Sequence, residues 1–410
     1  MNVPAYIAKR IAFNRQRSFS RFIIRLATAA TALSVAAMII TIAFVNGFQR
    51  TISQKVFSFW GHIRVQQFEP SKALVAEETP LEQNAGVVNL LKHTKGIRQV
   101  QSFATKSAVI DKDREIEGVL FKGVDKDYDF NNLNSFLTAG RWISFADTLY
   151  AKEIVVSATT ARQLNIQLND SVNVYFISPE TGKSNFRKLH VCGIYKTGIE
   201  DYDNLFALGD IRLLRRINNW DKNQIGGYEL FLTDYRNMDT LSNQLYDKLP
   251  DVWVSRTIKE VYPNIFDWLN IQDVNRDVIF IIMGVVAIIN LITCLLILVL
   301  ERVRMVGILK ALGNPDWGIQ KIFLYHTAII SGTGIAIGLF IGIGTCLLQQ
   351  YTGFISLDES AYYVSVAPVH LIWWQVAAIC AGTLAVCVIA LIIPTLLVRT
   401  IKPVKAIRFS

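Results

Sequence analysis

The tripeptide Gly182-Lys183-Ser184 is the nearest approach in this sequence to a nucleotide-binding motif. It matches the end of a phosphate-binding loop, G-x-x-x-x-G-K-[ST], in which backbone amides and a lysine cradle phosphates. The first glycine of that pattern would fall at position 177, which is Ile177. We interpret the tripeptide as a turn and expect this chain to bind no nucleotide.

Two acidic groups have residue types suited to binding a cation. Carboxylates alternate along one segment, at Asp111, Asp113, Glu115 and Glu117. Alternation along a single strand would place them on one exposed face. The second group, Glu200, Asp201 and Asp203, has the oxygen ligands that calcium prefers. Solvated surface is the more common role of such clusters, so we predict no metal site, no catalytic residues and no cofactor bound by this chain.

Long apolar segments decide the class of protein. Residues 278–300 contain no charged side chain, and a helix of this length reaches about 35 Å, enough to cross a hydrocarbon core of roughly 30 Å. We predict four transmembrane helices, at 26–47, 277–300, 322–348 and 372–398. The fold class is an α-helical membrane protein with one large α+β extracytoplasmic domain, 48–276, inserted between the first and second helices.

Charge predicts the orientation of these helices. Basic residues dominate the N-terminal segment 1–25, the loop 301–321 and the tail 399–410, while the rest of the chain is slightly acidic. Basic segments stay in the cytoplasm. We therefore expect a multi-pass inner-membrane protein with both termini cytoplasmic, a periplasmic domain and a short periplasmic loop, 349–371. Charge localised in this way gives no support to a nucleic-acid partner.

The region between the first two spans has a mixed pattern. Strand-like runs occupy residues 63–67, 109–110 with 116–124, 154–157, 172–177, 189–195 and 228–233. Helix-like runs occupy 83–93, 159–164 and 239–249. We predict an α+β domain, divided into two subdomains.

The junctions between spans and domain carry apolar residues at helical spacing. Phe48, Ile52 and Val56 follow the first span, and Trp268 and Leu269 precede the second. We predict that both helices continue beyond the membrane as stiff stalks, with these five side chains facing substrate. The alternative is an ordinary juxtamembrane pedestal.

The third span contains a regular series of glycines, Gly334, Gly338 and Gly342. A glycine every fourth residue leaves a bare backbone strip that allows a neighbouring membrane helix to approach closely. We predict a helix-packing face here, although glycine is also common in membrane helices generally.

The loop 301–321 contains a short amphipathic helix. Its apolar stripe consists of Met305, Val306, Ile308, Leu309 and Leu312. Gly313 suits a left-handed helix stop, and Asn314 with Pro315 suits the start of the next helix. The helix is either a passive element lying on lipid or a docking element whose apolar anchors are rimmed by Arg304 and Lys310.

This loop resembles the coupling segment of the FtsX-like permease superfamily, E-R-x-x-x-[IV]-G-[IV]-L-[KR]-A-[LM]-G. The matching residues are Glu301, Arg302, Val306, Gly307, Ile308, Leu309, Lys310, Ala311, Leu312 and Gly313. Asn46-Gly47-Phe48 resembles the lipoprotein-releasing (LolC/LolE-type) branch, and the segment from Glu153 to Ile194 resembles the periplasmic domain shared with MacB. The tail from Lys402 to Arg408 resembles the family's closing motif.

The resemblance implies an ABC transporter permease that acts as a mechanotransmitter. A separate cytoplasmic ATPase dimer would bind ATP and Mg²⁺ and grip residues 301–313, Met305 included. The second permease would be another copy or a paralogue, and the substrate a lipoprotein passed to a periplasmic carrier. Alternatives are a MacB-like efflux permease and a cell-division-type regulator of periplasmic hydrolases. Only 25 residues precede the first span, whereas MacB-type exporters usually carry a fused ATPase there, which favours the lipoprotein-releasing branch.

Overall fold

The computed structural model of the chain describes residues 19–70, 76–146, 149–177 and 184–390. The chain divides into two compact units. The helical unit comprises Met1–Arg50, Trp268–Ser356 and Val366–Ser410, and the β-rich unit comprises Thr51–Asp267 and Leu357–Ser365. The expected segments 1–18, 391–398 and 399–410 lie outside the described residues.

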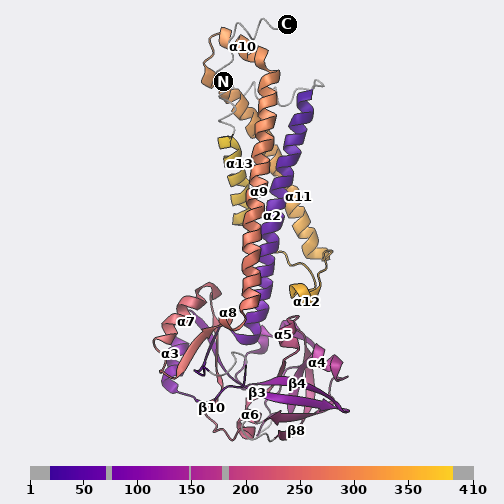
Figure 1. Cartoon of the computed structure of the whole chain (residues 1–410), viewed down its shortest axis with the longest axis vertical. Coiled ribbons are helices and arrows are strands. Elements are labelled where there is room, and N and C mark those ends of the chain that lie inside the picture. Colours follow the sequence, from indigo (N-terminus) through magenta and orange to yellow (C-terminus); the bar gives the residue numbers. More distant parts are fainter. Residues whose placement is uncertain (1–18, 71–75, 147–148, 178–183, 391–410) are drawn as a thin grey trace. The chain divides into compact units, whose positions relative to one another are not determined.

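Long helices make up the helical unit (Figure 1). They are α2 (Phe19–Trp60), α9 (Pro263–Glu301), α11 (Asp316–Thr352) and α13 (Trp373–Ala390), and the short α10 (Val303–Ala311) links α9 to α11. Among the described helices, α2, α9 and α11 are long and apolar enough to cross a membrane, whereas α13 is shorter. Both α2 and α9 run without a break from one unit into the other.

The glycine series of α11 lies against α2. A Cβ atom at Gly338 would come within 2.5 Å of the carbonyl oxygen of Ala32. A Cβ atom at Gly334 would lie 2.9 Å from Cβ of Thr31, and one at Gly342 would lie 3.1 Å from Cβ of Ile39. Glycine at these positions brings the two backbones together, and the larger residues of both helices fill the space around them.

One sheet forms the centre of the β-rich unit. Among the described residues its order is β12-β1-β11-β3-β4-β9-β6-β8-β5, and β7 pairs with both β3 and β8. Two pairs, β4 with β9 and β6 with β8, are parallel, and the other pairs are antiparallel. The strands are β1 (Ile63–Gln67), β3 (Ile97–Lys112), β4 (Glu115–Val124), β5 (Leu137–Gly140), β6 (Glu153–Ser157), β7 (Ser171–Ile177), β8 (Ser184–Tyr195), β9 (Phe206–Asp210), β11 (Gly227–Leu232) and β12 (Trp253–Thr257). The short strands β2 (Leu81–Glu82) and β10 (Gln224–Ile225) pair separately.

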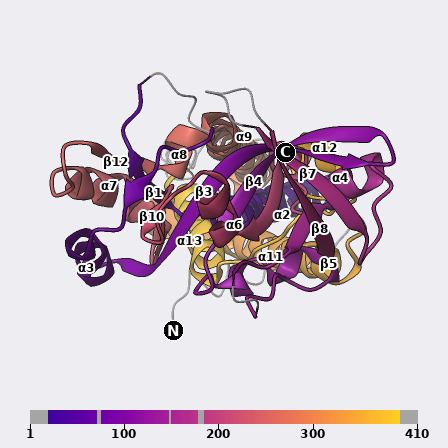
Figure 2. The same ribbon diagram turned by 90° about the horizontal axis from the view of Figure 1, so that it is seen from below.

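Short helices flank this sheet. Figure 2 shows α7 beside β12 and α3 beside β3, and α4 packs against β6. The helices are α3 (Ala85–His93), α4 (Ala158–Gln163), α5 (Glu200–Asp203), α6 (Ile211–Ile217), α7 (Met238–Tyr246), α8 (Ile258–Val261) and α12 (Glu359–Tyr362).

All the strand and helix runs expected for this region coincide with observed elements. The prediction of two subdomains is wrong, because one sheet joins both groups of helices into a single compact unit.

A buried charge holds the end of α2 in the sheet. The Lys122 ammonium on β4 donates a hydrogen bond to the carbonyl oxygen of Phe59, at 2.6 Å, and pairs with Glu229 on β11, at 2.7 Å. Both charged side chains are fully buried, which lowers the pKa of Lys122 and raises that of Glu229. The last carbonyls of a helix have no intrahelical partner, so this ammonium satisfies one of them and complements the helix dipole. We call Lys122, Glu229 and the Phe59 carbonyl the anchor.

Aromatic rings surround the anchor. Lys122 Nζ lies 4.6 Å from the ring centre of Trp60, and the Arg64 guanidinium lies 4.2 Å from the same ring. Arg64 also bonds Glu78, at 2.8 Å. Cations over aromatic faces gain about 1–2 kcal/mol when removed from water, so the rings partly offset the cost of burying the charge.

We predict that Gly338→Leu destabilises the helical unit, because the new side chain collides with backbone and not with a movable side chain. Overpacking of this kind costs about 1–3 kcal/mol or more. Thermal unfolding of the purified full chain in detergent measures the loss. Gly332→Leu is the matched control, since a Cβ at Gly332 meets no atom within 4 Å. Equal midpoints for the two variants would contradict close packing at Gly338.

We predict that Lys122→Met lowers the stability of the β-rich unit by about 3–5 kcal/mol, because it leaves Glu229 charged and buried without a partner. The double variant Lys122→Met with Glu229→Leu should recover most of the loss, since an apolar pair avoids the desolvation penalty. It should remain about 1 kcal/mol below the native chain, because the Phe59 carbonyl still lacks its donor. Protease resistance of the full chain during denaturant titration measures the stability of the native chain, the single variant and the double variant. A double variant no better than the single one would count against the ion pair as the source of the loss.

Candidate functional site

The segment 301–313 forms a separate short helix. Arg302, with φ of −106° and ψ of 13°, interrupts the helical path between α9 and α10. Gly313 ends α10 in the left-handed region, at φ of 84°. The backbone N–H of Asn314 then donates a hydrogen bond to the carbonyl oxygen of Leu309. Pro315 then occupies the position just before α11, one residue earlier than the first-turn place expected for it. Lys310 pairs with Asp316 across this turn, at 2.9 Å.

The apolar stripe of α10 divides into two faces. Val306 is fully buried in a cluster with Leu298, Ile319 and Phe323, and Met305 and Leu309 pack against the same cluster. Gly307 is buried beside Val306. Ile308 and Leu312, by contrast, are 47% and 78% exposed. One face therefore fixes α10 to α9 and α11, and only the other is available to contact lipid or a partner.

The remaining residues of the segment lie on or beside the open face. Glu301, Ala311 and Gly313 are exposed, and Arg302 and Lys310 are half-buried. The open face thus has apolar residues at its centre with charged groups at its margins. We call Ile308, Ala311 and Leu312 the open face of α10.

Five consecutive residues of α2, 46–50, contact three other parts of the helical unit; we call them the junction segment. The Asn46 amide donates to Gln375 Oε1 on α13, at 2.6 Å, and Gln49 donates to Asp273 on α9, at 2.8 Å. Phe48 packs edge to face against Trp268 of α9, with ring centres 5.7 Å apart. The junction segment is therefore the place where α2 is tied to both α9 and α13.

The chain before α13 also reaches the junction segment. A Cβ atom at Gly47 would lie 2.2 Å from the carbonyl oxygen of Pro368, so only glycine allows this approach. His370 donates its backbone amide to Ala43 and lies 3.0 Å from the Arg50 guanidinium through Nε2. An arginine can only donate, so His370 accepts there; partial burial and the Arg50 charge both lower the pKa of His370.

The residues predicted to line a substrate path differ in accessibility. Ile52 and Val56 are fully buried, and Leu269 is only 5% exposed. Phe48 and Trp268 are half-buried and meet each other. Within one chain, Ile52, Val56 and Leu269 act as packing residues, and the Phe48–Trp268 pair offers the accessible surface.

The candidate phosphate loop and the acidic groups have structural roles. Ile177 ends β7 and Ser184 begins β8, paired opposite each other in an antiparallel hairpin, whereas a phosphate loop is followed by a helix. Residues 178–183 lie outside the described residues. Asp111 and Glu115 lie on different strands, because Asp113 and Arg114 form the turn between β3 and β4 at positive φ. The expectation of one strand face is therefore wrong.

In the second acidic group, Asp203 is already satisfied by the chain itself. Asp203 is buried and accepts bonds from the Thr197 and Gly198 amides at 2.9 Å each. Within the described part of the chain, no three histidine, cysteine or acidic side chains are grouped as metal ligands would be.

Sequence reasoning missed the polar half of the junction. Gln49, Asp273, Gln375 and His370 were not singled out, although each lies at the end of an apolar span. Polar residues at the same end of three spans are a usable signal, because an amide or carboxylate at that depth needs a partner on a neighbouring helix.

Two family models match the chain. The model described as FtsX-like permease C-terminal matches residues 278–403, and that described as MacB-like periplasmic core domain matches residues 26–246, more than half of the chain. The first covers most of α9 together with α10, α11 and α13, and the second covers most of α2 and most of the β-rich unit.

Two of the similar proteins match this chain over its whole length or nearly so. The lipoprotein-releasing system transmembrane protein LolC of Neisseria meningitidis is 23% identical, with 100% of each chain covered. LolE of Haemophilus influenzae is also 23% identical, over 99% of each chain. The periplasmic region of MacB from Actinobacillus actinomycetemcomitans is 13% identical with a TM-score of 0.34, covering 50% of this chain and 91% of that one. The chain belongs to the FtsX-like ABC transporter permeases of the LolC/LolE type and carries a MacB-like periplasmic core domain.

Proposed function

We propose that this permease transmits force from a cytoplasmic ATPase dimer to its periplasmic domain, and that the work releases lipoproteins from the inner membrane. The observation that carries the proposal is the continuity of α2 and α9. At about 1.5 Å per residue, their 42 and 39 residues extend roughly 60 Å each, twice a hydrocarbon core of about 30 Å. A continuous helix transmits displacement along its axis, whereas a loop at the membrane surface would absorb it.

The ATPase acts at the open face of α10 in this proposal. ATP and Mg²⁺ belong to that separate subunit, and α10 receives its movement. Because Val306 and Leu309 fix α10 to α9 and α11, a push on Ile308 and Leu312 moves the long helices with it. Both termini lie in the cytoplasm in this arrangement, on the same side as α10.

The names of the relatives support the proposed cargo. LolC and LolE are named for lipoprotein release, and the similarity to them covers the full chain. Removing acyl chains from a bilayer costs about 0.8 kcal/mol per methylene, so release of an acylated protein requires an energy source such as ATP hydrolysis. A second permease, a copy or a paralogue, and a periplasmic carrier complete the proposed system.

We predict that Ile308→Asp and Leu312→Asp each weaken co-purification of the ATPase by tenfold or more, the effect of losing a central apolar contact, about 2 kcal/mol. Membrane insertion and thermal stability should remain native, since both positions are exposed. Ile116→Asp is the control, because Ile116 is an exposed apolar residue of the β-rich unit. Leu309→Asp is unsuitable, as it would disturb the cluster beneath α10. Normal ATPase recovery with both α10 variants would remove the docking role.

In the proposed cycle a push on α10 moves α9 against α2, so we predict that joining α2 to α9 at the junction uncouples hydrolysis from release. Gln49→Cys and Asp273→Cys place thiols where side chains now bond at 2.8 Å, within reach of a short reducible bis-maleimide. In proteoliposomes with the ATPase and a triacylated lipoprotein, the linked permease should hydrolyse ATP but release little lipoprotein. Reduction of the linker should restore release, and each single-cysteine variant is a control. Full release from the linked protein would refute movement of α2 against α9; no ATP-dependent release by the native permease would refute the lipoprotein cargo.

A further inference from the structure

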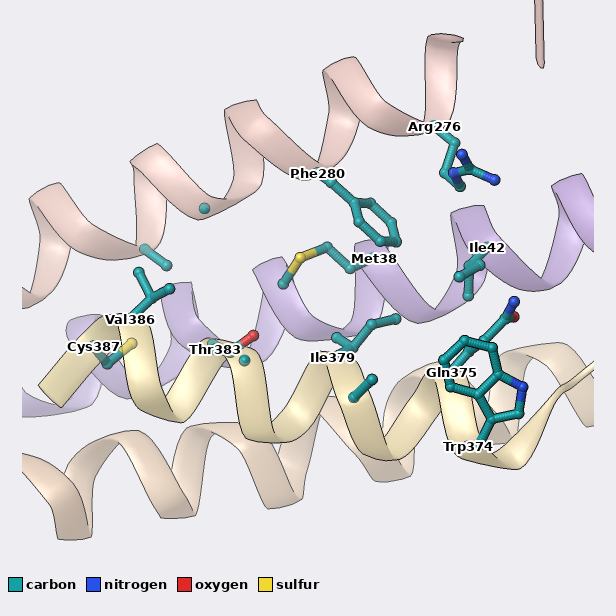
Figure 3. A pocket seen from close by; sticks show the side chains of 14 residues that line it. Met38, Ile42, Arg276, Phe280, Trp374, Gln375, Ile379, Thr383, Val386 and Cys387 are labelled. Carbon is teal, nitrogen blue, oxygen red and sulfur yellow. The ribbon is translucent and has the colours of Figure 1, made fainter. Parts of the chain in front are cut away.

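An apolar cavity of about 450 Å³ lies within the helical unit, between α2, α9 and α13 (Figure 3). Its walls include Met38, Ile42, Phe280, Ile379 and Val386. This volume is within the range of about 300–1,000 Å³ typical of ligand pockets. The junction segment and the open face of α10 contribute none of its lining residues.

The cavity is graded from polar to apolar along its length. Figure 3 shows Arg276, Trp374 and Gln375 at one end and Val386 with Cys387 at the other. On α9 the lining extends from Arg276 to Ala287, about 16 Å at 1.5 Å per residue. That length is close to half of a hydrocarbon core of about 30 Å, the depth of one leaflet.

The polar end carries both signs of charge. Arg276 bonds Asp273 at 2.7 Å and Asp277 at 2.9 Å, so two carboxylates surround one guanidinium. These three side chains sum to one negative charge, and Asp277 remains 63% exposed. A purely anionic headgroup would be repelled here. A zwitterionic headgroup has a phosphate for Arg276 and an ammonium for Asp277.

We propose that this cavity is a binding site for a phospholipid with a zwitterionic, ammonium-bearing headgroup, one acyl chain of which lies between α9 and α13. The depth, the apolar walls and the mixed charge at the mouth each match such a lipid. The proposal goes beyond the proposed function, because the lipid is a resident of one permease and not the cargo.

The test uses the full chain in nanodiscs, with photoactivatable phosphatidylethanolamine or phosphatidylglycerol carrying a diazirine near the end of one acyl chain. Mass spectrometry of the digest locates the label. We expect labelling on α9 and α13 lining residues such as Gly284, Ala287 and Thr383, about threefold stronger from phosphatidylethanolamine. Asp277→Asn should bring the ratio of the two probes towards one.

A filled cavity provides the decisive variant. Gly284→Leu with Gly382→Leu adds side chains where a Cβ meets no atom within 4 Å, so the helices need not move. This variant should lose the α9 and α13 labelling. Gly344→Leu, on an equally open glycine of α11 outside the cavity, should keep it.

Unchanged labelling in the filled variant, equal labelling by both lipids, or crosslinks from the cavity to a second permease copy would each overturn the proposal. Neither the ATPase nor a lipoprotein is needed for this measurement. Its failure is therefore distinct from a failure of the release assay.

Discussion

The structure depends on how α2 ends. A helix terminus buried in a protein leaves carbonyl groups without partners, and here the Lys122 ammonium fills that place for Phe59 while Glu229 neutralises it. Because Lys122 and Glu229 belong to different strands, β4 and β11, the helix end is bound to two strands of one sheet. An axial displacement of α2 must carry those strands along or separate a buried pair, at about 3–5 kcal/mol.

The junction segment is weaker than the anchor, and the difference has a functional consequence. Its hydrogen bonds, Asn46 to Gln375 and Gln49 to Asp273, are part-buried and contribute about 0.5–1.5 kcal/mol each. In the proposed mechanism these contacts would separate under load before the anchor does. In the proposed mechanism α2 would move against α9 and α13 while its end stays fixed in the sheet, as a force-transmitting stalk requires.

The sequence predicted local structure well and pairings poorly. The strand-like run at 63–67 located β1, and Gly313 marked the end of α10, because both signals lie within a few residues. The anchor joins residues 107 positions apart, and its only local sign is a lone charge inside each of two apolar runs, Lys122 and Glu229. The sequence of α10 shows one apolar stripe and not two faces, because the cluster that covers Val306 comes from other helices. When a segment is buried by elements far away in the sequence, its own residues do not show which of its faces will be covered.

Helix α9 carries most of the features that the proposed mechanism uses. It begins at Pro263, bonds the junction segment through Asp273, forms one wall of the cavity around Gly284 and ends next to α10 at Glu301. In the proposed mechanism a movement received at α10 would change the cavity before it reaches the β-rich unit. A phospholipid between α9 and α13 would favour the helix position that best fits its chain. In this way membrane composition would act on the same helix as the ATPase, without contacting either the ATPase or the cargo.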